Sequence, residues 1–293
     1  MFKTIINAWK IADLRKKMLF TALIVFIFRL GAALPVPFVN ISGGLISDQN
    51  ANNFMTYLSM MTGDAFNYGT LFAMSITPYI NASIIIELLT VAIPALERLA
   101  KEGEEGRKKI STITRYSSVV LALMQSTAYY FYIRSQNYLS LDADGNKFTG
   151  FFAVLQAITI IFCYTAGASL IMWLGEQINE KGIGNGISII LFAGIVSRMP
   201  TTLYSLYSYM DKGGAYYALA PIAFVSLILM IGFIVWMDNA ERRIPVQYAK
   251  RVVGRKMYGG QSTHIPIKVN MCGVLPIIFA SSILSLPSSE TQA

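Results

Sequence analysis

The chain has 293 residues, of which 54% are hydrophobic and only 14% are charged. A soluble globular domain carries about 25% charged residues, so this composition, with a mean hydropathy of +0.51, excludes an ordinary soluble protein. The net charge of +8 lies largely in the connections between apolar stretches, where it favours anionic lipid headgroups and cytoplasmic partners over a nucleic-acid groove.

The N-terminus is amphipathic and leads into the first apolar segment. Residues 1–17 set apolar side chains such as Phe2 and Trp9 against cations such as Lys3 and Lys10. This pattern predicts a helix that lies on the cytoplasmic membrane surface. The first spanning segment is predicted over 18–34, and a polar external loop follows it.

A short, moderately apolar stretch at 54–69 comes next. It is too short and too polar to span a bilayer, since a spanning helix needs about 20 mostly apolar residues, and a re-entrant half-helix on the external side is the better interpretation. The second spanning segment, 70–93, contains Pro78 and Asn81. Proline frees a carbonyl that protein or cavity water must satisfy, so this segment is predicted to line an interior.

Five more apolar segments follow, and two of the connections between them stand out. One is a turn at 175–186 with four glycines, and the other is a long connection at 238–268 that is rich in Lys and Arg. The sequence thus predicts seven spanning helices, the last five of them at 116–133, 151–174, 187–203, 216–237 and 269–286.

The cations alternate from one side of these segments to the other. The connections before Leu19, at 94–115, at 175–184 and at 237–268 hold 5, 6, 1 and 7 Lys or Arg, which is 19 of the chain's 24. Lys and Arg are retained on the cytoplasmic side of a membrane. The bias predicts a multi-pass protein with a cytoplasmic N-terminus and a seventh segment that exits outside.

Catalytic motifs are missing from the sequence. His264 is the single histidine, which excludes a two-histidine metal site. The glycine-rich turn at 182–186 lacks the lysine and the preceding strand that a phosphate-binding loop requires. We therefore expect no enzyme, no metal site and no cofactor.

Four runs of sequence carry a family resemblance. They read ITPYINASIII at 76–86, MWLGEQI continuing to GIGNGIS at 172–188, YAKR through to KVN at 248–270, and GVLP through to FASS at 273–282. Together, and in this order, they resemble the SecY family, the central pore-forming subunit of the bacterial Sec protein translocase. The resemblance implies an all-α polytopic membrane protein, a helical channel built from two inverted-topology halves.

The resemblance also implies how the chain divides. The cytoplasmic N-terminus at 1–17 would precede a first half at 18–203, with helices one to five and the re-entrant stretch at 54–69. The second half would begin at 204–293, with helices six and seven and the basic connection at 238–268. The family has ten helices, so the second half is incomplete here: the sequence is either an N-terminal portion of a longer protein or a shortened relative.

A narrow waist closed by an external plug is the central feature that the resemblance implies. Each of the pairs 76/80 and 187/191 shares one helix face, and an apolar constriction blocks ions by excluding water. The plug position begins with Thr62-Gly63-Asp64 where the family shows a Gly-Gly-Ala-type start. The implied ring is Ile76, Ile80, Ile187, Leu191 and Ile278, and the implied plug is Met60, Met61, Thr62, Gly63, Asp64, Ala65, Phe66, Asn67, Tyr68 and Gly69.

A lateral gate and a docking surface are implied as well. The gate's polar cluster would comprise Asn81, Gln125 and Asn270, whose amides favour hydrogen bonds between helices. Cytoplasmic docking is predicted at Arg242, Arg243, Arg255 and Lys256. The implied partners are the SecE and SecG subunits, the SecA motor or the ribosome, signal peptides, nascent or unfolded polypeptides and membrane lipids, at the bacterial plasma membrane.

Two other functions remain open at this point. A secondary transporter for a small solute would also have a broken helix, a glycine-rich turn and inverted topology. Such a transporter needs convergent polar groups at the membrane midplane, whereas the implied ring is aliphatic. A non-conducting, truncated relative is the other alternative, if 293 residues are the whole protein.

Overall fold

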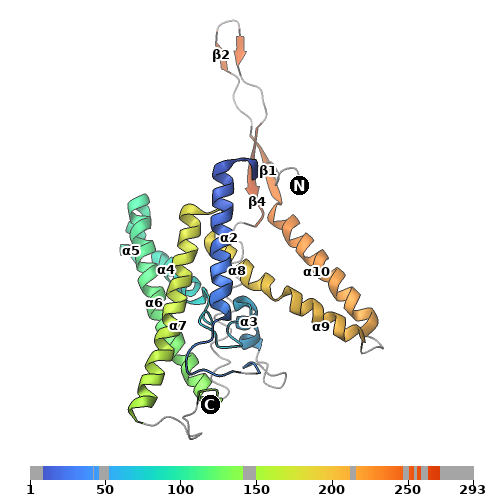
Figure 1. Ribbon diagram of the computed structural model, residues 1–293. Helices are drawn as coiled ribbons and strands as arrows, with labels where there is room; N and C mark the ends of the chain where they lie inside the picture. The colour runs from blue at the N-terminus through green and yellow to red at the C-terminus, as the bar shows by residue number, and fades with distance from the viewer. Residues whose placement is uncertain are drawn as a thin grey trace. The chain divides into compact units, whose positions relative to one another are not determined.

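A computed structural model of the chain describes residues 9–41, 43–45, 53–140, 150–211, 216–246, 251–253, 256–258 and 263–270 (Figure 1). The chain divides into two compact units, residues 1–201 and 202–293. The division falls inside a helix, close to the predicted boundary between the two halves at 203.

The first unit is a set of packed helices. In chain order they are α2 (Ala12–Ala33), α3 (Asn53–Thr62), α4 (Thr77–Ala92), α5 (Pro94–Lys101), α6 (Glu104–Ser135), α7 (Phe151–Lys181), α8 (Gly186–Ser197) and the start of α9 (Met199–Asp211). α6 lies between α4 and α7, and α2 packs against α7 and α8 (Figure 1). Residues 63–76 connect α3 to α4 through a series of turns. The predicted span at 70–93 is therefore helical only from Thr77, and Pro78 lies in the first turn of α4, where proline frees no carbonyl.

The buried core of this unit joins the turn segment to α6, to α7 and to the stretch after α2, from which Val36 and Leu45 come. Phe66 and Met74 come from the turn segment, Tyr129 from α6, and Ile160 and Tyr164 from α7. The three aromatic rings contact one another: the ring centroid of Tyr129 lies 4.7 Å from that of Phe66 and 5.1 Å from that of Tyr164. The core therefore fixes the turn segment against two long helices.

The connection between α7 and α8 is shorter than predicted. The sequence suggested a turn over 175–186, but α7 continues to Lys181, so the first two turns of that stretch are helical. Two asparagine side chains close the remaining connection. Asn185 caps α8 by accepting hydrogen bonds from the N–H groups of Ile187 (3.1 Å) and Ser188 (3.4 Å), and Asn179 accepts one from the N–H of Gly186 (2.7 Å).

Two further helices differ from their predicted bounds. α2 begins at Ala12, so Arg15 to Lys17, expected in a separate surface helix, belong to the same helix as the first apolar segment. The fifth predicted segment is interrupted at Arg198, which ends α8, and it continues as α9 to Asp211. Pro200 contributes to this break, because proline has no N–H to donate and is tolerated in the first turn of a helix.

The second unit combines a helix with two small antiparallel sheets. α10 (Tyr216–Asp238) leads into β1 (Glu241–Val246), which pairs with β4 (Thr263–Lys268), and β2 (Arg251–Val253) pairs with β3 (Lys256–Tyr258). The long basic connection, for which the sequence predicted no regular structure, thus contains four strands. The seventh predicted segment, 269–286, lies outside the described residues from 271 onward.

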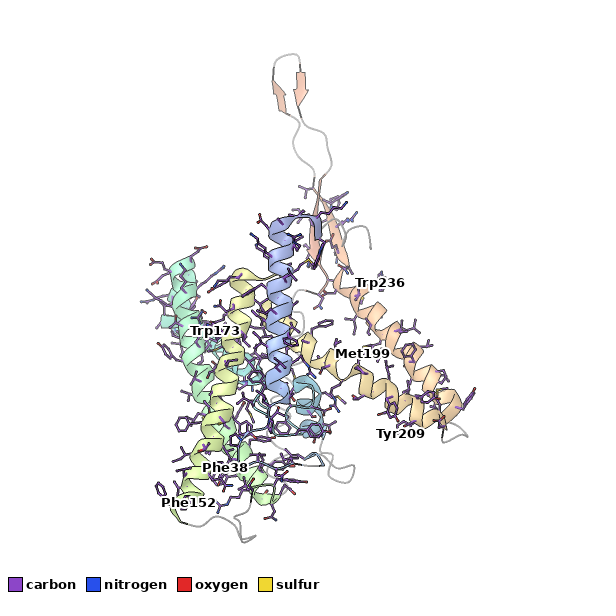
Figure 2. The ribbon with its side chains drawn as sticks, viewed as in Figure 1. Phe38, Phe152, Trp173, Met199, Tyr209 and Trp236 are labelled. Atoms are coloured by element: carbon purple, nitrogen blue, oxygen red, sulfur yellow. The ribbon has the colours of Figure 1, made fainter. Side chains whose placement is uncertain are left out.

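Several described helices are long and apolar enough to cross a membrane. By length and composition they are Phe151–Lys181, Gly186–Asp211 and Leu219–Asp238, and a fourth if α4 and α5, bent by 101°, form one span. Apolar side chains such as Phe152, Trp173 and Trp236 are exposed on α7 and α10 (Figure 2). α2 and α6, which carry the first and third predicted spans, are not among these described helices.

Candidate plug and pore site

Residues 60–69, the predicted plug, form the end of α3 and the tight turn after it. Gly63 and Asp64 both adopt left-handed backbone conformations, with φ angles of 65° and 70°. Glycine adopts this region without strain, and aspartate is one of the few other residues that visit it. The turn reverses the chain, so that Ala65 and Phe66 are buried while Met60 and Tyr68 remain exposed.

Two buried tyrosines hold the backbone of this segment. The Tyr129 hydroxyl donates a hydrogen bond to the Phe66 carbonyl at 2.5 Å, and the Tyr164 hydroxyl donates one to the Gly69 carbonyl at 3.0 Å. The segment is a turn without a regular hydrogen-bond ladder, and side chains from α6 and α7 supply donors to its carbonyls. The Phe66 carbonyl also accepts a hydrogen bond from the N–H of Gly69 at 3.3 Å. No sequence pattern indicated this role, because buried tyrosines are common in helices.

The segment also approaches the backbone of α8 closely. A Cβ atom added to Gly63 would lie 2.6 Å from the Gly194 carbonyl oxygen, and one added to Gly194 would lie 2.8 Å from the Met61 carbonyl oxygen. Both distances are shorter than any normal contact, so a side chain at either glycine would push the two segments apart. The glycines thus permit the plug segment to pack directly on α8.

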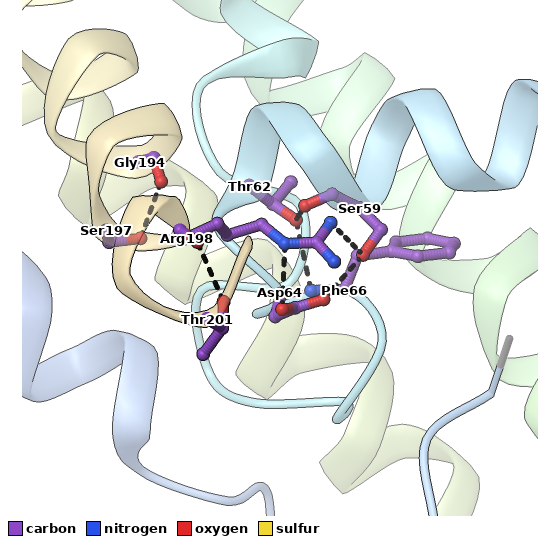
Figure 3. Close-up of polar contacts among 8 residues, drawn as sticks. All are labelled: Ser59, Thr62, Asp64, Phe66, Gly194, Ser197, Arg198 and Thr201. Carbon is purple, nitrogen blue, oxygen red and sulfur yellow. Dashed lines mark hydrogen bonds and ion pairs between the residues drawn. The ribbon is translucent and has the colours of Figure 1, made fainter. Parts of the chain in front are cut away.

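A polar cluster lies at this contact (Figure 3). Arg198, at the end of α8, makes an ion pair from its Nε to the Oδ2 of Asp64 at 2.9 Å. The hydroxyl of Ser59 donates to the Oδ1 of Asp64 at 3.0 Å, and the Nη1 of Arg198 lies 3.5 Å from the same hydroxyl. The carboxylate of Asp64 is therefore engaged through both oxygens, a pairing that sequence analysis missed.

The four described ring residues are wholly or partly buried. Ile76 occupies the N-cap position of α4 and is 1% exposed, and Ile80, one turn later, is 8% exposed. Ile187 and Leu191, on α8, are half-buried. The Cδ1 of Ile76 lies 3.7 Å from the position that a Cβ of Gly175 would take, so it packs towards α7. Ile278 lies outside the described residues, and the ring itself stays a prediction.

The predicted gate residues are divided between the two units. Asn81 on α4 and Gln125 on α6 are both half-buried, on helices that pack against each other. Asn270 belongs to the second unit, where its amide Nδ2 lies 3.4 Å from the Oδ1 of Asp238. The structure therefore brings the helices of the first two together, and the three-residue cluster stays a prediction.

The predicted docking cations lie on the basic connection. Arg242 and Arg243 are exposed on β1, opposite Ile267 and Pro266 of β4. Lys256 begins β3 and pairs with Val253 of β2, and Arg255 lies outside the described residues. Consecutive strand residues point to opposite faces, so the two arginines present positive charge on both faces of the β1–β4 hairpin.

The long apolar helices, with their exposed apolar side chains, define a polytopic helical membrane protein. The model of the SecY family matches residues 70–293. The chain is 42% identical to a protein translocase subunit SecY from Streptomyces scabiei over its full length, and 44% identical over 98% of its length to one from Corynebacterium glutamicum. The chain belongs to the SecY family, and it spans 67% and 65% of the lengths of these two relatives.

Solved structures agree with this assignment at the level of the fold. A protein-conducting channel matches 92% of the chain with a TM-score of 0.61 at 19% identity, and the chain covers 56% of that structure. A SecY structure whose plug domain stabilises the closed channel matches with a TM-score of 0.59, and Sec61 in a canine ribosome-channel complex with 0.60. Family membership favours a channel over the small-solute transporter and makes the chain a multi-pass membrane protein.

Proposed function

We propose that this chain forms the pore of a channel through which unfolded polypeptides cross the bacterial plasma membrane and from which apolar segments leave into lipid. Residues 60–69 are its plug, and Ile76, Ile80, Ile187 and Leu191, with Ile278, line its waist. The proposal assigns the chain no catalytic step. The cytoplasmic orientation of the N-terminus follows from the distribution of Lys and Arg.

One observation carries this proposal: the plug segment packs on the same helix that bears two of the ring residues. Ile187, Leu191, Gly194 and Arg198 recur at helical spacing and fall within about 60° of one another around the axis of α8. Gly194 and Arg198 contact the plug segment. The plug segment thus contacts the same face of α8 that carries the two ring residues. The contact extends to Arg198, about 10 Å beyond Leu191 along the helix axis.

The partners of the chain follow from the same proposal. The SecE and SecG subunits would cover exposed apolar helices such as α10. The SecA motor or the ribosome would bind the basic β1–β4 hairpin, and signal peptides would enter through the gate that Asn81, Gln125 and Asn270 help to close. These assignments rest on the family and on the exposed arginines of β1.

The seal is tested by making the waist polar. Confined water at an aliphatic wall loses hydrogen bonds that the wall cannot replace, so ions meet a desolvation barrier. We expect the double substitution Ile80→Asn and Ile187→Asn, in the assembled channel that contains this chain, to raise the ion conductance of planar bilayers. Deletion of the plug should add further leak.

A matched control uses two isoleucines of the same helices that are exposed. Ile85 on α4 and Ile195 on α8 have exposures of 45% and 55%. The double substitution Ile85→Asn and Ile195→Asn adds the same amides away from the ring, and it should leave the conductance unchanged. A ring variant that conducts no more than the parent channel would refute the proposed seal.

A further inference from the structure

We propose that Ser59, Asp64 and Arg198 form a polar latch that holds residues 60–69 against α8, and that the strength of this latch sets how readily the plug segment leaves its seat. The three residues are positioning residues for the plug. The inference rests on the proposed plug role, and it adds the interaction that controls the plug's release.

The chain positions the arginine of the latch through the break between α8 and α9. Arg198 is the C-cap of α8, and its N–H bonds back to the carbonyls of Ile195 and Val196. A cation at a helix C-terminus interacts favourably with the helix dipole. The guanidinium therefore lies at the end of the helix face that carries Ile187, Leu191 and Gly194, and it extends to the plug segment from there.

The aspartate of the latch is fixed from the other side. Its left-handed φ of 70° follows that of Gly63, and its N–H donates to the Ser59 carbonyl at 3.0 Å. Thr62 supports the same turn, because its hydroxyl donates to the Ser59 carbonyl and accepts from the N–H of Phe66, both at 3.2 Å. The carboxylate is thus held in place before it meets Arg198, which reduces the entropy lost when the pair forms.

The partial exposure of the Asp64–Arg198 ion pair suits a contact that breaks when the plug segment moves away from α8. The side chains of Arg198 and Asp64 are 30% and 24% exposed. A fully buried pair would leave an uncompensated charge when broken, whereas a fully exposed pair contributes almost nothing. Water reaches both partners of this pair, so each charge can be rehydrated as the plug segment moves away.

The rate at which a reagent modifies a cysteine at position 65 reports how readily the plug segment leaves α8. Ala65 is 2% exposed when the segment is seated, and Ala65→Cys adds a small thiol there in a channel whose Cys163 and Cys272 are replaced by serine. We expect Asp64→Asn, which keeps a residue that tolerates the left-handed backbone, to raise the rate of modification by an impermeant external thiol reagent by roughly three- to tenfold. Ion conductance is recorded on the same variants.

A double-mutant cycle separates the latch from general damage. Arg198→Gln should raise the modification rate as Asp64→Asn does, and the two changes together should add little beyond either one. The control Glu97→Gln removes the exposed ion pair between Glu97 and Lys101 on α5 and should leave the rate at its parent value. Unchanged rates in the latch variants, or effects that simply add, would overturn the latch. A faster rate without extra conductance would keep the latch and refute the sealing role of residues 60–69.

Discussion

At the scale of single residues, two buried tyrosines, Tyr129 of α6 and Tyr164 of α7, hold the backbone of the predicted plug. Tyr129 and Tyr164 are 5% and 0% exposed, and each donates to a carbonyl of the plug region. Tyr164 is also in edge contact with Tyr129, with ring centroids 5.1 Å apart. The two hydroxyls therefore tie residues 66–69 to α6 and α7.

Removing one of these hydroxyls should destabilise the protein. We expect Tyr129→Phe to remove the shorter of the two hydrogen bonds that the Phe66 carbonyl accepts, since the N–H of Gly69 still donates to it. The loss should lower the free energy of unfolding by about 0.5–1.5 kcal/mol. The change is measured by titrating the purified protein with a denaturing detergent. Tyr116, on the same helix, is 72% exposed, and Tyr116→Phe should change the free energy by less than about 0.5 kcal/mol. Equal effects of the two variants would contradict the role given to Tyr129.

At the scale of elements, the described part of the basic connection between α10 and residue 268, called the arm below, consists of two pairs of antiparallel strands. The six residue pairs of β1 and β4, from Glu241 with Lys268 to Val246 with Thr263, hold the arm's base in one register. Every residue of β1 is exposed except Val246, which is half-buried. A paired strand presents its cations at fixed spacing, which suits the recognition of an acidic or phosphate-bearing partner.

Reversing the charge of this arm should weaken docking. We expect Arg242→Glu with Arg243→Glu, and separately Arg255→Glu with Lys256→Glu, to raise the dissociation constant for the SecA motor or the ribosome by roughly tenfold or more. Binding is measured at physiological salt, where exposed charges are screened beyond about 8 Å. Lys101→Glu on α5 serves as a cytoplasmic charge control and should bind as the parent does. If the arm variants also bind normally, these cations serve membrane topology alone.

At the scale of the whole molecule, the distribution of Lys and Arg predicts one orientation in the membrane. The bias between the two sets of connections is 19 to 3, and every connection is short enough for the positive-inside rule to apply. The first, third, fifth and seventh predicted spans then run outward, which places the plug segment on the external side. The labelling experiment on Ala65, which uses an external reagent, depends on this orientation.

Cysteine labelling in intact cells tests the orientation. We expect an impermeant reagent added outside to modify cysteines placed at Asp142 and Asp211 and to leave those placed at Glu104 and Lys250 unmodified. Permeabilised cells, in which all four sites should react, provide the control for accessibility. Modification of a cysteine at Lys250 from outside would reverse the topology and remove the basis for cytoplasmic docking.

The sequence by itself determined the class of the protein and most of its helices. The apolar stretch at 151–174 appears within α7, and the apolar stretch at 216–237 appears as α10. The family resemblance was confirmed as well. These features are readable because hydropathy, helix propensity and short motifs belong to neighbouring residues.

Only the tertiary structure decided how the plug segment is held. Asp64 looked like a departure from the family's plug sequence and Arg198 like a cation at a helix end, but the fold places them 2.9 Å apart. In the same way Gly194 became informative only beside the Met61 carbonyl, and Tyr129 only beside that of Phe66. Such contacts join segments that are distant in the chain, so they depend on close packing between helices, which no local pattern encodes.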